Sequence, residues 1–368
     1  MVSSVPTISF GKHGTVYVYD TATGSLLHTL MSDDIEVDDR FGASIGIYGN
    51  TIIIGAPDND KEEVVGGAAY LFDATTGQQI SRFSTGNPTF LDGVDFFGSS
   101  VAIGDGVALI ARPQIGPDPS GAYLYDLTAG TPPTNIFSGV QIGPEDIGAS
   151  VVLSGNTAAV GSYRFDVGGP GFHTGEGAVF LFDVTTGNQT GMLVAEDGSD
   201  DDRFGEFVAV NGNYALVGGA ANNDAGPWNG SAYLFDITTS AQLFQLAPED
   251  GEPLRNFGRI VAINDQYAFV SAESVDRIGM VYMFDLITGA QVHKFTGSDT
   301  QVDDQFGASL AIHGNVLVVG AAGVDGANPN SGAAYIFTIP EPAGVMVFAV
   351  LGPMVLGRSR RSSGQAGG

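Results

Sequence analysis

The chain has 368 residues, of which 54 are Gly, 43% are hydrophobic and 15% are charged. Its formal net charge of −27, from 14 Lys and Arg against 41 Asp and Glu, argues against a nucleic-acid ligand, whose phosphates need basic side chains. The sequence has no Cys, which excludes disulfide bonds, and one large β domain can use a chain of this length.

The stretch from Phe41 to Phe83 reads as four short β-strands. A Phe-Gly pair opens it, and a Gly49-Asn50 turn separates an alternating segment from the apolar run Ile52–Ile54. Gly-Asn between two such runs is typical of a two-residue hairpin, because both residues tolerate positive φ. A third segment ends at Asp73, and a Thr-Thr-Gly turn leads to the fourth. Such an antiparallel meander needs neighbours to cover its faces.

This unit recurs in order along the chain. Six successive copies of its third strand end in an aspartate, and a seventh ends in a threonine. These residues are Asp20, Asp73, Asp126, Asp183, Asp236, Asp285 and Thr338. The Phe-Gly opening recurs at Phe97, Phe204, Phe257 and Phe306, with a degenerate copy at Ile147. A period of about 50 residues with four strands per period is typical of a β-propeller.

The repeat therefore predicts an all-β propeller of four-stranded antiparallel blades over residues 1–338, followed by a tail over residues 339–368. Seven blades, the first of them incomplete, are the preferred count. In the alternative ring of six blades, Ser25–Leu30 supplies the final fourth strand and Thr15–Asp20 is surplus.

Seven complete blades need two strands that the pattern does not show: a first strand for the first blade and a fourth for the last. Thr7–Gly11 serves as the second strand of the first blade, joined to the third by a Lys12-His13-Gly14 turn. We expect the two missing strands upstream of Met1, since an N-terminal strand commonly closes a propeller. An export signal is expected there too, because Met1–Phe10 lacks the basic start and apolar core of a signal peptide.

Aspartates mark two kinds of loop. Those that end the third strands are expected to accept hydrogen bonds from turn amides, with no catalytic role. A second group gathers before Phe-Gly, in the loops between blades: Asp33, Asp34, Asp38, Asp39, Asp200, Asp201, Asp202, Asp303 and Asp304. This group either forms solvated turns or binds Ca²⁺, a hard cation that takes several oxygen ligands.

The chain resembles the FG-GAP repeat proteins from about residue 10 to residue 338. Phe-Gly opens each repeat, and Gly55-Ala56-Pro57 closes the second strand, with weaker copies at Gly218-Gly219-Ala220 and Gly320-Ala321-Ala322. The resemblance implies a seven-bladed propeller like that of integrin α subunits and bacterial surface proteins. The calcium sites of integrins do not carry over, because the loop between the first two strands is too short here.

A second resemblance involves the segment Tyr70–Gly77, which is similar to the repeat of pyrroloquinoline-quinone dehydrogenases. It implies the alternative function of a quinoprotein-type propeller enzyme. Those repeats usually carry a docking Trp, whereas this chain has one Trp, Trp228, placed in a loop. A quinone site also needs cationic groups near the cofactor, and Lys and Arg are scattered singly along the sequence.

Other chemical motifs are few. The five histidines share no metal-ligand spacing and are expected to be structural or solvated: His13, His28, His173, His293 and His313. The long loops Ser162–Gly177 and Ala221–Gly230 hold the aromatic residues Phe165, Phe172 and Trp228. These aromatic side chains either bind a ligand, as exposed loops often do, or pack locally over the blade.

The tail has three parts: Pro340-Glu341-Pro342, the uncharged segment Ala343–Gly357, and the cluster Arg358, Arg360 and Arg361. The apolar segment is expected to form a short hydrophobic helix, which would span about 22 Å, less than the ~30 Å of the hydrocarbon core. The order resembles the PEP-CTERM sorting signal of Gram-negative bacteria, which implies an exosortase partner, cleavage during export and transient membrane contact. The alternative is a last core strand with a basic end.

Together these patterns indicate an exported propeller of the cell envelope, cell surface or extracellular matrix, which acts as a binding, adhesion or structural module. Its ligand is expected to be a protein or a polysaccharide. Calcium is the one cofactor that the sequence suggests, and no catalytic residue is assigned.

Overall fold

The structure is a computed structural model. It describes residues 2–7, 14–36, 38–60, 66–84, 96–113, 121–128, 134–135, 147–167, 175–199, 202–219, 230–249, 254–274, 277–325, 332–340 and 349–355.

Strands in these residues form seven antiparallel sheets. The first sheet has three strands: β1 (Val2–Thr7), β2 (Thr15–Asp20) and β3 (Leu26–Leu30). The second comprises β4 (Ser44–Tyr48), β5 (Thr51–Ala56), β6 (Ala68–Asp73) and β7 (Gln79–Phe83). The third comprises β8 (Val101–Gly104), β9 (Val107–Arg112), β10 (Gly121–Asp126) and β11 (Thr134–Asn135). The fourth comprises β12 (Ser150–Ser154), β13 (Thr157–Ser162), β14 (Ala178–Asp183) and β15 (Gln189–Leu193).

The remaining sheets repeat this meander. The fifth comprises β16 (Phe207–Asn211), β17 (Tyr214–Gly219), β18 (Ser231–Asp236) and β19 (Ala241–Leu246). The sixth comprises β20 (Leu254–Arg255), β21 (Val261–Ile263), β22 (Tyr267–Ser274), β23 (Met280–Asp285) and β24 (Gln291–Phe295), with β20 and β21 both paired to β22. The seventh comprises β25 (Phe306–His313), β26 (Val316–Ala321), β27 (Ala333–Thr338) and β28 (Ala349–Val355).

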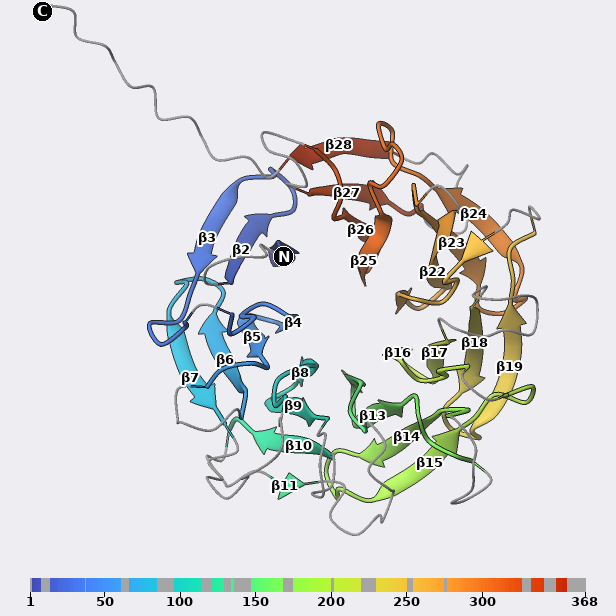
Figure 1. Cartoon of the computed structure of the whole chain (residues 1–368). Helices are drawn as coiled ribbons and strands as arrows, with labels where there is room; N and C mark the ends of the chain where they lie inside the picture. Colours follow the sequence, from blue (N-terminus) through green and yellow to red (C-terminus); the bar gives the residue numbers. More distant parts are fainter. Residues whose placement is uncertain are drawn as a thin grey trace, which may run out of the picture.

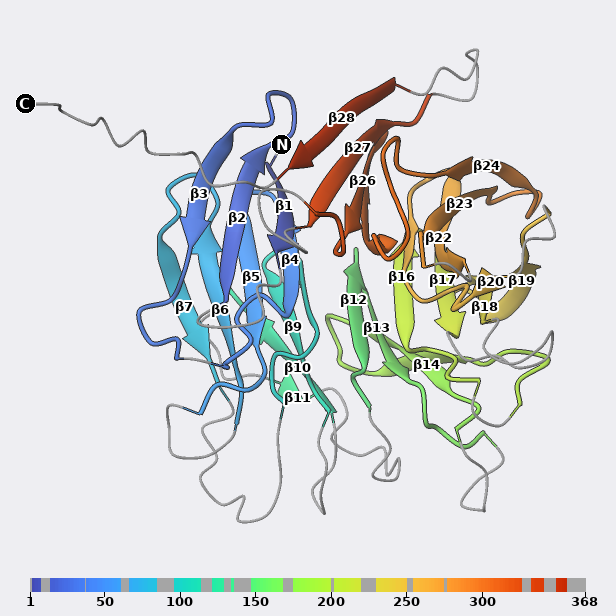
Figure 2. The ribbon, with the colours of Figure 1, turned by 45° about the horizontal axis from the view of Figure 1, so that its top comes forward.

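The sheets are arranged as blades around a ring, with strands such as β4 and β25 innermost and β7 and β28 outermost (Figure 1). The sheet of β1 to β3 lies between the blade that ends in β7 and the blade that ends in β28, in both views (Figures 1 and 2). The predicted all-β propeller is thus confirmed, and the described residues contain no helix. Six sheets are complete blades and the first has three strands, so the count of seven blades stays a prediction.

In the six complete blades, a tight hairpin joins the second strand to the strand before it. Gly49 takes φ 56° between Tyr48 and Thr51, which face each other across β4 and β5. Gly155, Gly212 and Gly314 take φ of 55° to 56° at the equivalent turns. The two-residue Gly-Asn hairpins predicted from the sequence are therefore confirmed.

Adjacent sheets pack face to face through apolar side chains. Between the first two sheets, Val16 and Val18 of β2 lie against Ile52 and Ile54 of β5, and all four are fully buried. Four tyrosines of the third strands are at most 1% exposed: Tyr70, Tyr233, Tyr282 and Tyr335. Each blade is thus stabilised by its neighbours, because burial of apolar area is the main favourable term in folding.

The N-terminal strand lies earlier than predicted. β1 spans Val2–Thr7, with Thr7 opposite Thr15 of β2, so the assignment of Thr7–Gly11 as the partner strand is wrong. Val2–Thr7 contains the β-formers Val and Thr, and its pairing satisfies the inner edge of β2. Lys12 and His13 lie outside the described residues.

The tail also differs from expectation. Ala349–Val355 form β28, the fourth strand of the last blade, which pairs antiparallel with β27. The helix predicted here is therefore wrong for these residues, and so is the placement of this fourth strand upstream of Met1. Pairing gives the edge of β27 hydrogen-bond partners that a separate helix would not supply. No helix of the described residues has the length and apolar character needed to cross a membrane.

Candidate functional site

Successive strands of a blade run in opposite directions, so the loops that connect them lie alternately on the two faces of the ring. Loops between blades, which carry Phe-Gly, share one face with the loops between second and third strands. We call this the Phe-Gly face. The tight hairpins lie on the opposite face, called the hairpin face.

Each Phe-Gly pair anchors its loop to the ring. The Phe41 ring meets the edges of Tyr70 and Phe72 at centroid distances of 5.6 and 6.1 Å. Gly42 takes φ 91° and donates its backbone N–H to the Gly55 carbonyl at 2.9 Å. Phe97, Phe204, Phe257 and Phe306 make the same pair of aromatic contacts in their own blades. The side chains beside each Phe-Gly pair are therefore held on a rigid support.

Three aspartates of the acidic loops have a structural role. Asp39 and Asp202 are 2% exposed and Asp304 is 9% exposed. Each carboxylate accepts the backbone N–H of the residue three positions earlier, which is Glu36 at 2.8 Å, Ser199 at 2.7 Å and Gln301 at 2.5 Å. The next residue in each loop takes the left-handed conformation, with φ of 57°, 58° and 55° at Arg40, Arg203 and Gln305. These carboxylates close the loops.

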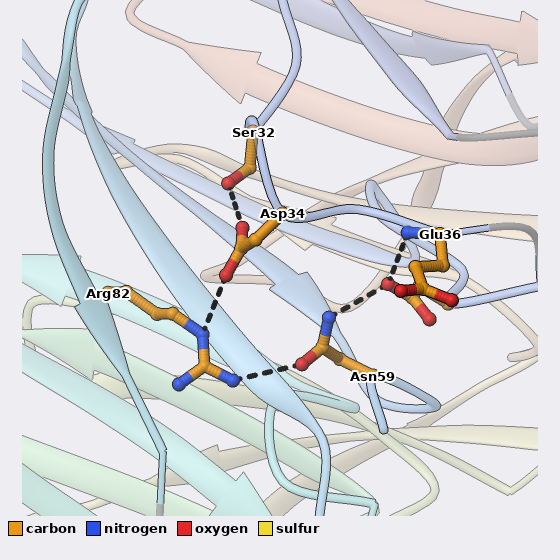
Figure 3. Close-up of polar contacts among 6 residues, drawn as sticks. Ser32, Asp34, Glu36, Asn59 and Arg82 are labelled. Atoms are coloured by element: carbon orange, nitrogen blue, oxygen red, sulfur yellow. Dashed lines mark hydrogen bonds and ion pairs between the residues drawn. The ribbon is translucent and has the colours of Figure 1, made fainter. Parts of the chain in front are cut away.

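Asp34 belongs to a polar network between the first two sheets (Figure 3). It accepts a hydrogen bond from Ser32 and forms an ion pair with Arg82 at 3.1 Å. Arg82 also donates to Asn59 Oδ1 at 2.9 Å, and Asn59 Nδ2 donates to Asp39 at 2.8 Å. The network joins the loop before β4 to the loop after β5, so it braces the Phe-Gly face.

Asp299 takes the place of Asp34 in the last blade, seven residues before the Phe of its Phe-Gly pair. It accepts a hydrogen bond from the Tyr335 hydroxyl at 2.7 Å. Burial is the main cause that raises the pKa of the Tyr335 hydroxyl, and burial likewise raises the pKa of Tyr70 to about 12. Both phenols are therefore neutral at physiological pH, and the Tyr335 hydroxyl acts as a hydrogen-bond donor.

The other acidic candidates remain separate. Asp33, Asp38 and Asp303 are exposed, and Asp200 and Asp201 lie outside the described residues. Among the residues that the structure describes, no group of three or more His, Cys, Asp or Glu could hold a metal ion. In the described part of these loops, the carboxylates therefore do not gather as they would around a calcium ion.

The aspartates that end the third strands act as predicted. Asp73 Oδ1 accepts the backbone N–H groups of Thr75 and Thr76, both at 2.8 Å. Turn amides donate in the same way to Asp20, Asp126, Asp183, Asp236 and Asp285. Hydrogen bonds from the turn hold the pKa of Asp20, Asp73, Asp183 and Asp236 below the usual value.

Of the three aromatic residues in the long loops, Phe165 lies in the described part of the chain, and it packs locally. Phe165 is partly buried and meets Phe180 edge-on at 5.2 Å between centroids, which supports the packing alternative. Phe172 and Trp228 lie outside the described residues. The tail residues Glu341, Pro342, Arg358, Arg360 and Arg361 lie outside them too.

Two histidines have clear structural contacts. The His28 ring bonds the Thr75 carbonyl at 2.9 Å, across two blades. His293 packs against Phe295 with centroids 4.6 Å apart, and burial lowers the pKa of His293. His13 and His173 lie outside the described residues.

The hairpin face contains a cavity of about 550 Å³. His313, Asn315 and Pro340 line it together with two hydrogen-bonded hairpins of the preceding blades. There Asn211 Nδ2 donates to Asp265 Oδ1 at 2.7 Å, and Asn264 Nδ2 donates to the Gly314 carbonyl at 3.0 Å. Pro340 of the predicted sorting motif thus lies beside this polar cavity.

The repeat pattern did not single out a group of opposite charges on the Phe-Gly face. Arg203 and Glu206 pair at 2.6 Å on one blade, and Arg259 and Glu273 pair on the next. We call these four residues the Arg–Glu cluster. One signal was available in the sequence: the residue after Phe-Gly is Glu206 or Arg259 here but Ala or Ser in four other repeats.

Three segments, residues 26–72, 188–235 and 290–337, match the model of the FG-GAP repeat family. In these three segments the chain is similar to FG-GAP repeats. No curated protein matches the chain.

The FG-GAP repeat is offset from the blade by one strand. Each matched segment begins at or just before an outer strand, β3, β15 or β24, and ends in the third strand of the following blade. One FG-GAP repeat therefore spans two blades, and the loop that connects them lies within the repeat.

Proposed function

We propose that the protein is an exported β-propeller that acts as a binding or structural module at the cell surface or in the extracellular matrix. The observation that carries this proposal is the rigid ring of FG-GAP-like blades, whose anchored Phe-Gly loops present charged side chains on one face. Loops on a rigid scaffold are where recognition residues commonly lie, because their backbone position is fixed while their side chains can vary.

The tail supports the exported location. Its order of Pro-Glu-Pro, apolar segment and Arg residues resembles that of a sorting signal, and the FG-GAP repeat is typical of extracellular proteins. We propose that an exosortase-type enzyme cuts the chain near Pro340–Pro342, a cut that would also remove β28 from the last blade. The high negative charge suits such a setting, because it keeps a protein soluble and separate from its neighbours.

A binding screen tests the module. The full chain is applied to immobilised glycans, envelope polymers and envelope protein fractions, with heat-unfolded chain as the control. We expect saturable binding of the folded chain to at least one polymer or protein fraction. Failure to bind any of them, together with dye reduction after quinone and calcium are added, would support the quinoprotein alternative and overturn the proposal.

Calcium is proposed as a weak surface ligand at most. Asp39, Asp202 and Asp304 already accept backbone hydrogen bonds, and the exposed Asp33, Asp38 and Asp303 do not form a cluster. Calorimetry with calcium should give no heat or a millimolar dissociation constant. Micromolar binding that is lost in an Asp303→Asn variant would contradict this reading of the loops.

A further inference from the structure

The cavity on the hairpin face lies where three successive blades depart from the internal repeat. It has a volume of about 550 Å³, and its hairpins join the innermost strands of the fifth, sixth and seventh sheets to the strands that follow (Figure 1). The residue before the turn of each hairpin has an amide or imidazole side chain, and these residues are Asn211, Asn264 and His313. The same position holds Tyr48, Gly104 and Ser154 in the second, third and fourth sheets. Nitrogen-bearing side chains therefore gather at the cavity.

Hydrogen bonds between blades hold the wall of this cavity in place. Asn211 Nδ2 of the fifth sheet donates to Asp265 Oδ1 in the hairpin of the sixth at 2.7 Å. Asn264 Nδ2 in the same hairpin donates to the Gly314 carbonyl of the seventh sheet at 3.0 Å. Asn264 Oδ1 also accepts two backbone N–H groups of its own hairpin, at 3.0 and 2.8 Å. The three hairpins are therefore fixed relative to one another, and the cavity is preformed.

Asn315 lines the cavity with a side-chain amide that has a structural role in two other blades. Asn50 and Asn156 occupy the equivalent position. Each donates to the aspartate that ends its third strand, and each accepts the threonine hydroxyl two residues after that aspartate. In the last blade these two positions hold Thr338, which has no carboxylate, and Pro340, which has no hydroxyl. The exposed Asn315 amide therefore lacks both of these partners and is available to a ligand.

The side chains that line the cavity favour an uncharged ligand. Of the described residues that line it, none is Lys or Arg and one is acidic, Asp265, whose carboxylate already accepts from Asn211. An anionic ligand would therefore meet a carboxylate and no basic partner. Among the described residues, no group of three or more His, Cys, Asp or Glu could hold a metal ion, so a metal site is not favoured either. Amides both donate and accept hydrogen bonds, as the hydroxyl groups of a ligand do.

Apolar side chains lie beside these polar groups. Ile263, Ile312 and Ile339 also line the cavity, and Ile263 and Ile339 are at most 8% exposed. A sugar ring has hydroxyl groups around its edge and C–H groups on its faces, so it matches a lining of amide and aliphatic side chains. The volume of about 550 Å³ lies within the roughly 300–1,000 Å³ of small-molecule sites.

We infer that this cavity binds a neutral sugar residue of an oligosaccharide. Asn315, Gln266 and His313 supply the hydrogen-bonding groups that contact the sugar. The interblade hydrogen bonds of Asn211 and Asn264 hold the hairpins that carry these groups. This inference rests on the proposed binding function, and it adds a ligand class and a place for that ligand on the hairpin face.

The test applies the full chain to immobilised neutral oligosaccharides of glucose, galactose and mannose, with uronic-acid and amino-sugar oligomers as charged counterparts. Calorimetry then measures the affinity for the neutral oligosaccharide that binds most strongly. We expect the affinity to fall about tenfold in Asn315→Ala, because the amide donates to and accepts from the sugar. The melting temperature of each variant checks that the ring remains folded.

Asn213→Ala is the matched control. Asn213 has the same turn position in the fifth sheet but lies outside the lining of the cavity. Its carbonyl accepts the Ile237 N–H at 2.9 Å, as the Asn315 carbonyl accepts the Ile339 N–H at 2.7 Å, and alanine keeps both carbonyls. This variant should bind the oligosaccharide like the unaltered chain.

Asp265→Asn tests the charge of the ligand. The new amide oxygen can still accept from Asn211 Nδ2, so the wall is retained while the carboxylate charge is lost. A neutral sugar should bind this variant with nearly unchanged affinity, whereas a cationic ligand would bind much more weakly. Loss of binding in Asp265→Asn, equal loss in Asn213→Ala and Asn315→Ala, or binding of charged oligomers alone would overturn the inference. Polymer binding in the wider screen that persists in Asn315→Ala would refute the inference alone, whereas binding of nothing would also refute the proposed function.

Discussion

The Ser44 hydroxyl donates a hydrogen bond to the Gly98 carbonyl of the next blade at 2.8 Å. Ser150 donates to the Gly205 carbonyl in the same way at 3.0 Å. In both cases the acceptor is the glycine of a Phe-Gly pair. The Phe-Gly loop of one blade is therefore a hydrogen-bond partner of the blade before it, in addition to its own aromatic contacts.

The glycine that closes a second strand makes this approach feasible. A Cβ on Gly55 would lie 1.9 Å from the Gly98 carbonyl oxygen, which belongs to the backbone of the next blade. Gly55→Ala should lower the free energy of unfolding by about 3 kcal/mol through overpacking. Gly49→Ala is the control, because no atom lies within 4 Å of its added Cβ and only its positive φ of 56° opposes the change, at about 1 kcal/mol. Urea unfolding would measure both, and equal losses would contradict the interblade explanation.

Substitutions at Asp202 and Asp303 compare a buried aspartate that closes its loop with an exposed one. Asp202→Ala should lower the free energy of unfolding by about 2 kcal/mol, because the Ser199 backbone N–H and hydroxyl lose their acceptor. Asp303→Asn keeps a residue type that tolerates the φ of 70° at this position and removes only an exposed ion pair with Arg277, so it should stay within about 0.5 kcal/mol. Similar effects of the two substitutions in thermal unfolding would show that loop closure does not depend on the buried carboxylate.

His293 should make stability depend on pH. Burial lowers its pKa in the folded state, so the unfolded chain binds the proton more readily. The stability that neutral His293 contributes is present above the unfolded pKa of about 6.5 and is lost as pH falls through the folded pKa. Melting temperatures measured from pH 8 to pH 5 should fall less steeply for His293→Gln. Parallel curves for the two proteins would contradict this assignment.

Much of the ring is encoded locally. Gly-Asn hairpins, Asp-capped turns and Phe-Gly openings depend on a few neighbouring residues, so each could be predicted from sequence. The β28 strand could not, because an apolar run such as Ala349–Val355 suits a helix or a strand until its pairing with β27 is known. The ion pair between Arg259 and Glu273 was overlooked for a similar reason, because the two residues are not neighbours in the sequence and meet only in the folded blade.

Because β28 lies in the tail, removing the tail should destabilise the last blade. Deletion of residues 341–368 would leave β27 with an unpaired outer edge, which favours association with other strands. We expect a melting temperature lower by roughly 5 °C and concentration-dependent association in analytical ultracentrifugation. Deletion of residues 356–368 alone retains β28 and is the control. A monomer of unchanged stability after the longer deletion would show that β28 is dispensable to the last blade.

Export is the claim on which the proposed function depends, and the native protein tests it directly. Cells that produce the chain are separated into cytoplasmic, membrane, envelope and extracellular fractions, and the C-terminus of the protein in each fraction is determined by mass spectrometry. We predict protein in the envelope or outside the cell whose C-terminus lies near Pro340–Pro342. Protein confined to the cytoplasm with an intact C-terminal Gly368 would contradict both export and sorting.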